Sequence, residues 1–175
     1  MRRTIGFALV TAIIGLIVAF GFVVTGQAQQ AGAEKAKPAK TLESLLKEAG
    51  FDYTKTKEGT CKIFVTAGEQ SAMVYADEVA LGEKKDTKLI YLYCLAVEVP
   101  SGFKHPIGML KKIAEINDGL MVGKLGISPD TGGVWYSSSL WLRTADADTL
   151  TSELALALFS VPEYRKELKP FVKEE

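Results

Sequence analysis

Strand-forming segments fill the middle of the chain and constrain its fold more than any other feature. Four segments rich in Val, Ile, Thr, Tyr and Phe follow one another over residues 53–57, 60–66, 71–81 and 88–99, with short links between them. β-branched and aromatic residues favour strands, and short links join neighbouring strands in antiparallel order. The run from Leu89 to Val97 is apolar at nearly every position, which predicts a central strand covered on both faces.

Helical patterns stand on both sides of these strands. Thr41 can cap a short helix that Gly50 ends, and Pro106 opens a second helix that ends at residues 117–119. Two more strands follow, at 122–127 and 134–143, joined by the turn 128–133.

A third helix closes the pattern. Asp146 or Asp148 caps it, and the capping box from Ser160 to Glu163 predicts a separate last turn that ends near Val172. Strands grouped before and after a central helix indicate the α+β class. We expect an antiparallel sheet with helices packed on it, in the order α-β-β-β-α-β-β-α.

The N-terminus has the order of a secretory signal. Arg2 and Arg3 precede an uncharged run from Ile5 to Val24, and Ala28 provides a small residue for cleavage. Residues 1–28 are therefore predicted to be a signal peptide. The run is also long enough to cross about 30 Å of hydrocarbon, so an uncleaved membrane anchor is the alternative, and residues 5–24 would then be the only membrane contact. Both interpretations place the rest of the chain outside the cytoplasm, either periplasmic, secreted or anchored there.

The remaining chain divides into a linker and one domain. Residues 29–40 are predicted to be a flexible linker, because they lack aromatic and β-branched side chains, and residues 41–175 suffice for one core. Without residues 1–28 the chain keeps 19 basic and 21 acidic side chains. Such a balance, without a basic stripe, excludes nucleic acid as a partner.

Two cysteines, Cys61 and Cys94, lie in different predicted strands. An exported chain with an even number of cysteines invites a disulfide. In a simple meander, however, another strand separates them, and cysteines with Cα atoms more than about 7 Å apart cannot be bridged. We therefore expect two buried free thiols.

The residues suited to catalysis are few. Cys94, Glu98 and His105 are near in sequence, but His105 follows a loop and precedes the helix-opening Pro106, so a nucleophile–base pair is not indicated. One histidine and two distant cysteines do not provide the four ligands of a zinc site. We predict no catalytic residue, no metal and no cofactor.

The last predicted strand carries the candidate interaction residues. Alternation places one set on a single face: Trp135, Ser137, Ser139, Trp141 and Arg143. Three consecutive serines make the strand unusually small and polar for a core. One interpretation is an exposed face for a protein partner or a second copy. The other is that both tryptophans cover the rim of the core beneath a helix.

The stretch from the second helix into the following strand resembles the YbjN family of bacterial sensory transduction regulators, and the wider type III secretion chaperone-like fold. The resemblance lies in Ile116-Asn117-Asp118-Gly119-Leu120 and Gly123-Lys124-Leu125-Gly126-Ile127, with Ala114 where the family has a first asparagine. It implies an α+β sandwich, often a homodimer, that binds protein segments or regulatory partners without enzymatic activity. Most such relatives are cytosolic, so export is a departure.

Two functions follow as hypotheses. The first is an exported, non-enzymatic binding or regulatory module of the YbjN-like type that acts through contacts with a protein partner or with itself. The alternative is a small cell-envelope enzyme or ligand-binding protein with a pocket near His105.

Overall fold

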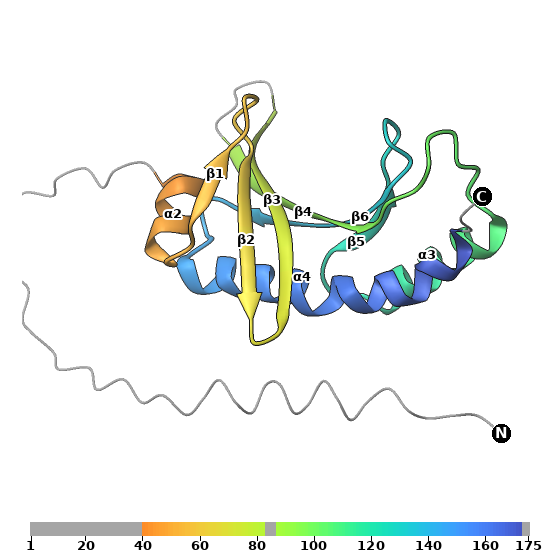
Figure 1. The fold of residues 1–175 in the computed structure, drawn as a ribbon. Coiled ribbons are helices and arrows are strands. Elements are labelled where there is room, and N and C mark those ends of the chain that lie inside the picture. Colours follow the sequence, from red (N-terminus) through yellow and green to blue (C-terminus); the bar gives the residue numbers. More distant parts are fainter. Residues whose placement is uncertain (1–39, 83–86, 173–175) are drawn as a thin grey trace, which may run out of the picture. The chain divides into compact units, whose positions relative to one another are not determined.

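The computed structural model describes residues 40–82 and 87–172, which form one antiparallel sheet with helices on it (Figure 1). The predicted signal or anchor segment and nearly all of the linker lie outside the described residues. The elements, in chain order, are α2 (Leu42–Glu48), β1 (Tyr53–Lys55), β2 (Cys61–Ala67), β3 (Gln70–Leu81), β4 (Thr87–Val97), α3 (Ile107–Gly119), β5 (Lys124–Ile127), β6 (Val134–Trp141), α4 (Ala147–Leu168) and the 3-10 helix η1 (Lys169–Phe171). The predicted α+β class is confirmed.

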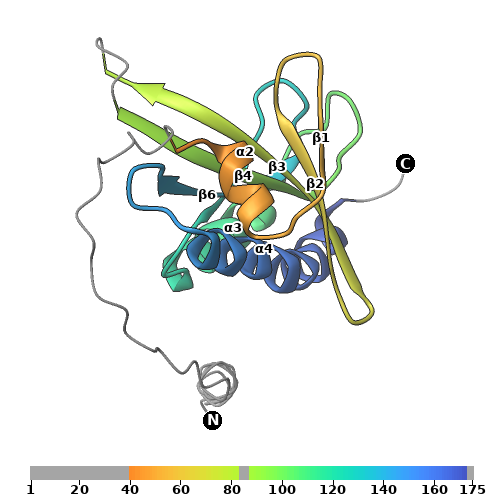
Figure 2. The same ribbon diagram turned by 90° about the vertical axis from the view of Figure 1, so that its left-hand side faces the viewer.

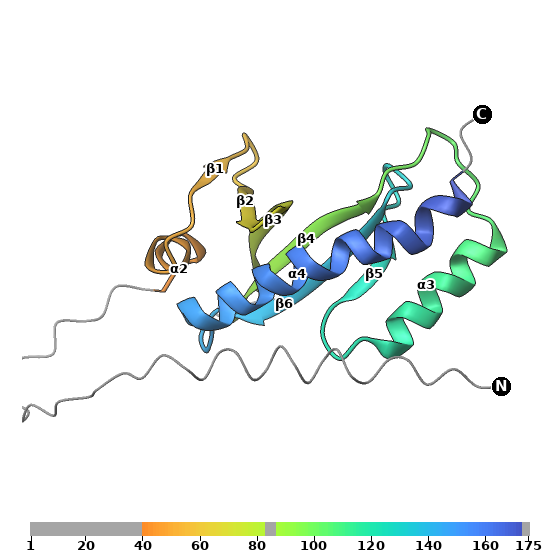
Figure 3. The same cartoon turned by 60° about the horizontal axis from the view of Figure 1, so that its bottom comes forward.

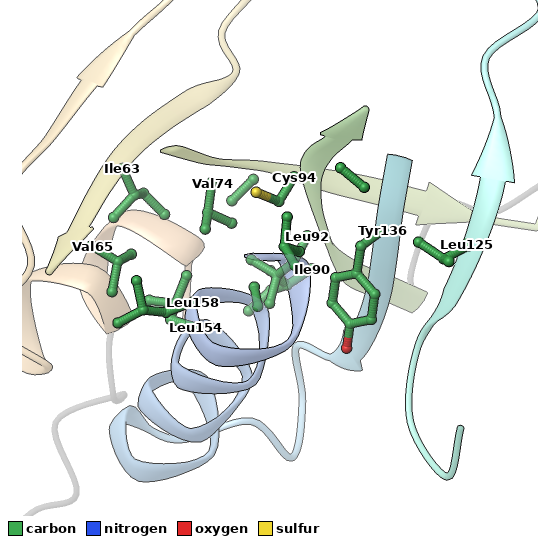
Figure 4. Packing of buried hydrophobic residues seen from close by; sticks show 14 of the residues in the cluster. Ile63, Val65, Val74, Ile90, Leu92, Cys94, Leu125, Tyr136, Leu154 and Leu158 are labelled. Atoms are coloured by element: carbon green, nitrogen blue, oxygen red, sulfur yellow. The ribbon is translucent and has the colours of Figure 1, made fainter. Parts of the chain in front are cut away.

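The sheet has the strand order β1-β2-β3-β4-β6-β5, and each neighbouring pair is antiparallel. The predicted meander therefore forms from β1 to β4, and the last hairpin joins it through β6. The register aligns one row of side chains across five strands, which we call the covered row: Ile63, Val74, Cys94, Tyr136 and Leu125. All five are buried, and Figure 4 shows them on the side of the strands where α4 lies.

The helices build the core on this one side of the sheet. Leu150, Leu154 and Leu158 of α4 are almost completely buried, as are Leu45 of α2 and Met109 of α3. These residues belong to one cluster with the covered row. Figures 2 and 3 show α4 running along the sheet with α3 beside it. Because each buried aliphatic side chain contributes about 1.5–3 kcal/mol, this layer supplies most of the stability.

Helix α2 begins and ends where the sequence predicts. The Thr41 hydroxyl accepts a hydrogen bond from the Ser44 amide at 3.1 Å, which caps the first turn. Gly50 adopts a φ of 75°, and the Phe51 amide donates to the Leu46 carbonyl at 2.9 Å. This left-handed termination favours glycine because a Cβ atom is disfavoured there.

Helix α4 is longer than the sequence predicts. Asp146 is its N-cap, and its carboxylate accepts a hydrogen bond from the Thr149 amide at 2.8 Å. The separate last turn predicted at Ser160 is wrong, because α4 continues through Pro162 to Leu168. An interior proline costs about 3 kcal/mol. Burial of Val161 and Leu168, on either side of it, offsets that cost.

Asn117 fastens α3 to the edge strand β5. Its amide nitrogen donates to the Leu125 carbonyl at 3.0 Å, and its amide oxygen accepts from the Leu125 amide at 2.7 Å. Beyond it, Gly123 has a φ of 74°, and a Cβ atom there would overlap the ring of Tyr136 at 2.6 Å. The stretch that carries the family resemblance therefore connects a helix to the sheet edge.

Strand β4 is central as predicted, but only one of its faces is covered. Ile90, Leu92 and Cys94 are buried beneath the helices, whereas Tyr91 on the other face is 38% exposed. The expectation of two covered faces is wrong for the described part of the chain, because α2, α3 and α4 all contribute to the same core and no helix of residues 40–82 and 87–172 lies on the opposite face. An apolar run shows that both faces of a strand avoid charge, and it does not show that both are packed.

Strands β3 and β4 part at one end. Their pairing stops at Val74 and Cys94, although β3 continues back to Gln70 along β2. There β4 has a bulge between Leu95 and Val97. The guanidinium group of Arg165 donates to the carbonyls of Ala96 at 2.9 Å and Leu95 at 3.0 Å. A side chain of α4 thus binds the part of β4 that β3 leaves unpaired.

The two cysteines are separated as expected. Cys61 lies on β2 and Cys94 on β4, with β3 between them, and both are buried free thiols. Burial raises the pKa of Cys61, and it raises the pKa of Cys94 to about 11. Both thiols are therefore protonated at neutral pH and serve as small core residues.

Candidate protein-binding site

The face of the sheet opposite the helices carries a second row of side chains, one residue along from the covered row. The register aligns Lys62, Tyr75, Tyr93, Ser137 and Lys124. Because side chains alternate along a strand, their neighbours two residues away share this face. We call its large aromatic residues together the aromatic face: Phe64, Tyr75, Tyr91, Tyr93, Trp135 and Trp141.

Four of these rings contact one another at the centre of the face. Tyr75 and Tyr93 stack with ring centroids 5.4 Å apart, and Tyr91 lies 5.6 Å from Tyr93. Trp135 meets Tyr75 and Tyr93 edge-on, at 6.0 and 5.7 Å. Aromatic pairs in these arrangements are worth about 0.5–1.5 kcal/mol each beyond the area they bury. The rings therefore hold each other in fixed positions without a covering layer.

The edges of the aromatic face are open to solvent. Phe64 on β2 is 59% exposed and Trp141 on β6 is 55% exposed. The aliphatic Val79 on β3 is also exposed and shares a cross-strand row with Leu89 and Trp141, whereas Phe64 pairs with Met73 farther back along β3. A contiguous exposed group of large apolar side chains is typical of an interaction surface on a protein.

The hydroxyl group of Tyr93 is held in place by the carboxylate of Asp77. It donates a hydrogen bond to Oδ2 of Asp77 at 3.0 Å. Burial raises the pKa of Tyr93, and the hydrogen bond to Asp77 raises it further, to about 12. The phenol is therefore neutral at physiological pH, and the carboxylate of Asp77 is engaged within the face.

The structure places the predicted interaction residues on this surface, with one exception. Trp135 is half-buried, Ser137 is buried beneath its neighbours, and Ser139 and Trp141 are exposed. The alternative that both tryptophans lie beneath a helix is wrong. They pair with Leu95 and Leu89 of β4, which share the face of Tyr91 and Tyr93, opposite the helices.

Arg143 is the exception. Strand β6 ends at Trp141, and Arg143 lies in the turn that follows. The Thr144 and Ala145 amides both donate to the Trp141 carbonyl, at 3.0 and 2.8 Å, and these bonds bend the chain toward α4. The predicted continuation of the strand to Arg143 is wrong, because alternation alone does not reveal where such a turn begins.

Sequence reasoning missed the aromatic residues that neighbouring strands contribute. Phe64, Tyr75, Tyr91 and Tyr93 alternate with core residues along β2, β3 and β4. That alternation is visible in the sequence. Assembling them into one surface required the pairing of the strands, which the structure provides.

The structure does not bring Cys94, Glu98 and His105 together as a catalytic group. Cys94 faces the core, while Glu98 is exposed beyond the end of β4. Nε2 of His105 donates to the Gly132 carbonyl at 2.7 Å, and its ring contacts Phe103 edge-on at 5.2 Å. His105 thus links the β5–β6 hairpin to the loop before α3.

A hollow of about 530 Å³ lies where β3 parts from β4, and His105 does not line it. Its lining includes Leu95 to Pro100 together with Arg165 and Lys169. Within residues 40–82 and 87–172, no three His, Cys, Asp or Glu side chains are grouped so that they could hold a metal ion. In the same part of the chain, no helix is long and apolar enough to cross a membrane.

The chain matches no family profile and no curated protein. Among solved structures, it is similar to a chain of the HopA1–SchA chaperone–effector complex, with 16% identity over 71% of this chain and 90% of that chain and a TM-score of 0.46. A chain from the complex of the Yersinia pestis type III secretion chaperone SycH with a stable fragment of YscM2 has 18% identity over 73% and 95% of the two chains, with a TM-score of 0.41.

A third similar structure is the heterodimeric ExoU–SpcU complex from the type III secretion system of Pseudomonas aeruginosa. It has 15% identity over 74% of this chain and 99% of that chain, with a TM-score of 0.48. Membership of the YbjN family stays a prediction.

Proposed function

We propose that this protein is a non-enzymatic binding module that holds a partner protein on the aromatic face of its sheet. One observation carries the proposal. The sheet buries one face beneath three helices and leaves a connected group of aromatic side chains on the other. Tyr and Trp are the residues that most often dominate binding energy at protein interfaces.

The aromatic face suits a protein partner for two physical reasons. The rings at its centre are already fixed by one another, so a partner does not have to order them on binding. The exposed rings at its edges, Phe64 and Trp141, have apolar area that a partner can remove from water. A preorganised centre with exposed anchors is favourable for affinity.

We propose further that the protein works outside the cytoplasm. The support is the N-terminal sequence, with Arg2 and Arg3 before the uncharged run and small residues after it. N-terminal sequencing of protein recovered from fractionated cells tests this proposal. A chain beginning at Gln29 supports a cleaved signal, and a full chain in the membrane fraction supports an anchor. A full chain recovered from the cytosol contradicts export.

Substitution of the exposed rings tests the binding proposal. Phe64→Ala combined with Trp141→Ala removes two anchors and leaves the core intact. We expect partner capture from a cell-envelope extract to fall about tenfold or more, because truncating an interface anchor costs more than about 1 kcal/mol. The thermal midpoint should change little.

The matched control removes equally exposed side chains from the helix layer. Leu156 and Phe159 of α4 are 42% and 50% exposed, so Leu156→Ala with Phe159→Ala changes a similar area elsewhere. We expect this variant to capture the same partners as the wild type. Equal capture by both double variants would contradict the proposal, and light scattering shows whether the captured partner is a second copy.

A further inference from the structure

Two lysines stand at opposite ends of the row that crosses the aromatic face. Lys62 lies on β2 and Lys124 on the edge strand β5, with Tyr75, Tyr93 and Ser137 between them. Nζ of Lys62 lies 6.0 Å above the ring of Tyr75, which keeps this charge over the face. Lys124 is exposed and alternates with the buried Leu125, so it belongs to the same surface.

Neither lysine is neutralised within the described chain. No carboxylate of residues 40–82 and 87–172 forms a salt bridge with Lys62 or Lys124. The nearest acid in the register is Asp77, one row along, and it accepts the hydrogen bond of the Tyr93 hydroxyl. This row is therefore aromatic at its centre and positively charged at both ends, and the Asp77 carboxylate lies beside it on the same face.

Charge decides between the possible occupants of this face. The chain's own segment 29–40 has three lysines and one glutamate, so the two lysines would repel it. A second copy docked face to face, with its row aligned on this one, would bring the same two cations against each other. A partner with negative charges at matching positions meets neither penalty.

We infer that the occupant is a protein segment with apolar side chains between two acidic residues, an inference that rests on the proposed function. Four strand spacings of about 4.8 Å separate Lys62 from Lys124, a distance of about 19 Å. An extended segment covers this distance with about six residues. The exposed Phe64 and Val79 favour a peptide over an acidic polysaccharide, because they offer hydrocarbon surface to apolar side chains.

Peptide display tests the inference directly. Random 12-residue peptides are selected on the full chain, on a Lys62→Glu/Lys124→Glu variant, and on a matched Lys47→Glu/Lys111→Glu variant that changes the same charge on α2 and α3. We expect the wild type and the matched variant to enrich peptides with apolar residues between acids. Those peptides should bind the Lys62→Glu/Lys124→Glu variant at least about tenfold more weakly, because attraction is replaced by repulsion at both ends.

The outcomes separate this inference from the proposed function. If the selected peptides lose binding on Phe64→Ala/Trp141→Ala but bind the Lys62→Glu/Lys124→Glu variant normally, the aromatic face binds proteins and the acidic partner is wrong. If the peptides bind both variants normally, or if no peptide is enriched, both proposals are overturned. Polygalacturonate is the polysaccharide probe. If it binds in a way that depends on the two lysines while no acidic peptide is enriched, the inference of a peptide partner is wrong and the partner is an acidic glycan.

Discussion

The two faces of the sheet are built from alternate residues of the same strands, yet they differ in burial and in charge. The covered row consists of aliphatic residues, a thiol and one tyrosine, and the helices bury all of it. The row beside it has lysine at both ends and tyrosine at its centre, and its neighbours are partly exposed. Large apolar side chains therefore occur on both faces, and the helix layer and the two lysines distinguish the faces.

The contacts that stabilise the fold therefore lie on one face of the sheet, and the proposed binding surface lies on the other. On the covered face a side chain is surrounded, so its removal leaves a cavity. On the aromatic face a ring touches mainly other rings, so its removal leaves a space that water fills. Substitutions at adjacent positions of one strand should therefore have very different effects.

Leu92 and Tyr91 provide the sharpest contrast and the largest expected effect. Leu92 is 2% exposed on the covered face, and Tyr91 is its neighbour on the open one. We expect Leu92→Ala to lower the free energy of unfolding by about 3 kcal/mol through cavity formation. Tyr91→Ala should cost about 1 kcal/mol, mainly through its lost ring contact.

Urea unfolding followed by circular dichroism measures both values. Tyr91→Phe is the control, because it keeps the ring and should behave like the wild type. Equal losses for Leu92→Ala and Tyr91→Ala would show that the open face is packed as tightly as the covered one, and the contrast between the faces would be lost.

Substitution of Asn117 tests the attachment of β5, the edge strand at which the covered row and the row beside it both end. Its side chain forms two hydrogen bonds with Leu125, and β5 contributes Leu125 to one face and Lys124 to the other. We expect Asn117→Ala to cost about 2 kcal/mol, because each bond contributes about 1 kcal/mol. Amide exchange of β5 should accelerate more than that of β2, and uniform acceleration across the sheet would contradict a local role.

The pKa values of two tyrosines, one on each face of the sheet, allow the faces to be compared. Burial raises the pKa of Tyr136 on the covered face to about 12, and Tyr93 on the aromatic face also reaches about 12 with the help of Asp77. Both values lie above the ordinary value near 10. The stability that depends on the neutral phenols is therefore complete below about pH 10 and is lost as the pH rises toward 12.

Asp77→Asn separates the two tyrosines. It removes the negative charge that accepts the Tyr93 hydroxyl, so we expect the pKa of Tyr93 to fall while that of Tyr136 is unchanged. Ultraviolet titration of the phenolates, with Tyr93→Phe and Tyr136→Phe for assignment, measures this. A fall for both tyrosines would mean that the variant loosens the whole sheet.

Lys62 should show the smallest effect on folding. Its ammonium group contacts the Tyr75 ring at 6.0 Å at a partly exposed position. We expect Lys62→Gln to change the free energy of unfolding by about 0.5 kcal/mol or less, because exposed cation–π contacts are weak. A loss above about 1 kcal/mol in urea unfolding would assign Lys62 to the stability of the fold and not to the binding surface.

Local sequence signals predicted most of the elements. The cap at Thr41, the stop at Gly50 and the alternation of β6 depend on neighbours within a few residues, and each is found in the structure. The errors arose where distant residues decide. Pro162 remains inside α4 because burial against the sheet outweighs a local break.

The candidate site was predictable only along a single strand. Alternation identified Trp135 and Trp141 as sharing a face, because that depends on β6 alone. The contribution of Tyr75 and Tyr93 depends on register across three strands, which no local pattern specifies. Which face the helices cover is likewise a tertiary property, so the sequence left open whether the tryptophans were packed or free.

Arg165 has a consequence for how copies of the chain meet. A strand with free carbonyl groups is a template onto which another chain can add, and this is a common start of aggregation. Arg165 occupies the carbonyls of Leu95 and Ala96 where β3 has left β4. The side chain of Arg165 thus satisfies two carbonyl groups at the point where β4 lacks β3 as a neighbour, and it leaves fewer free backbone acceptors there for another chain.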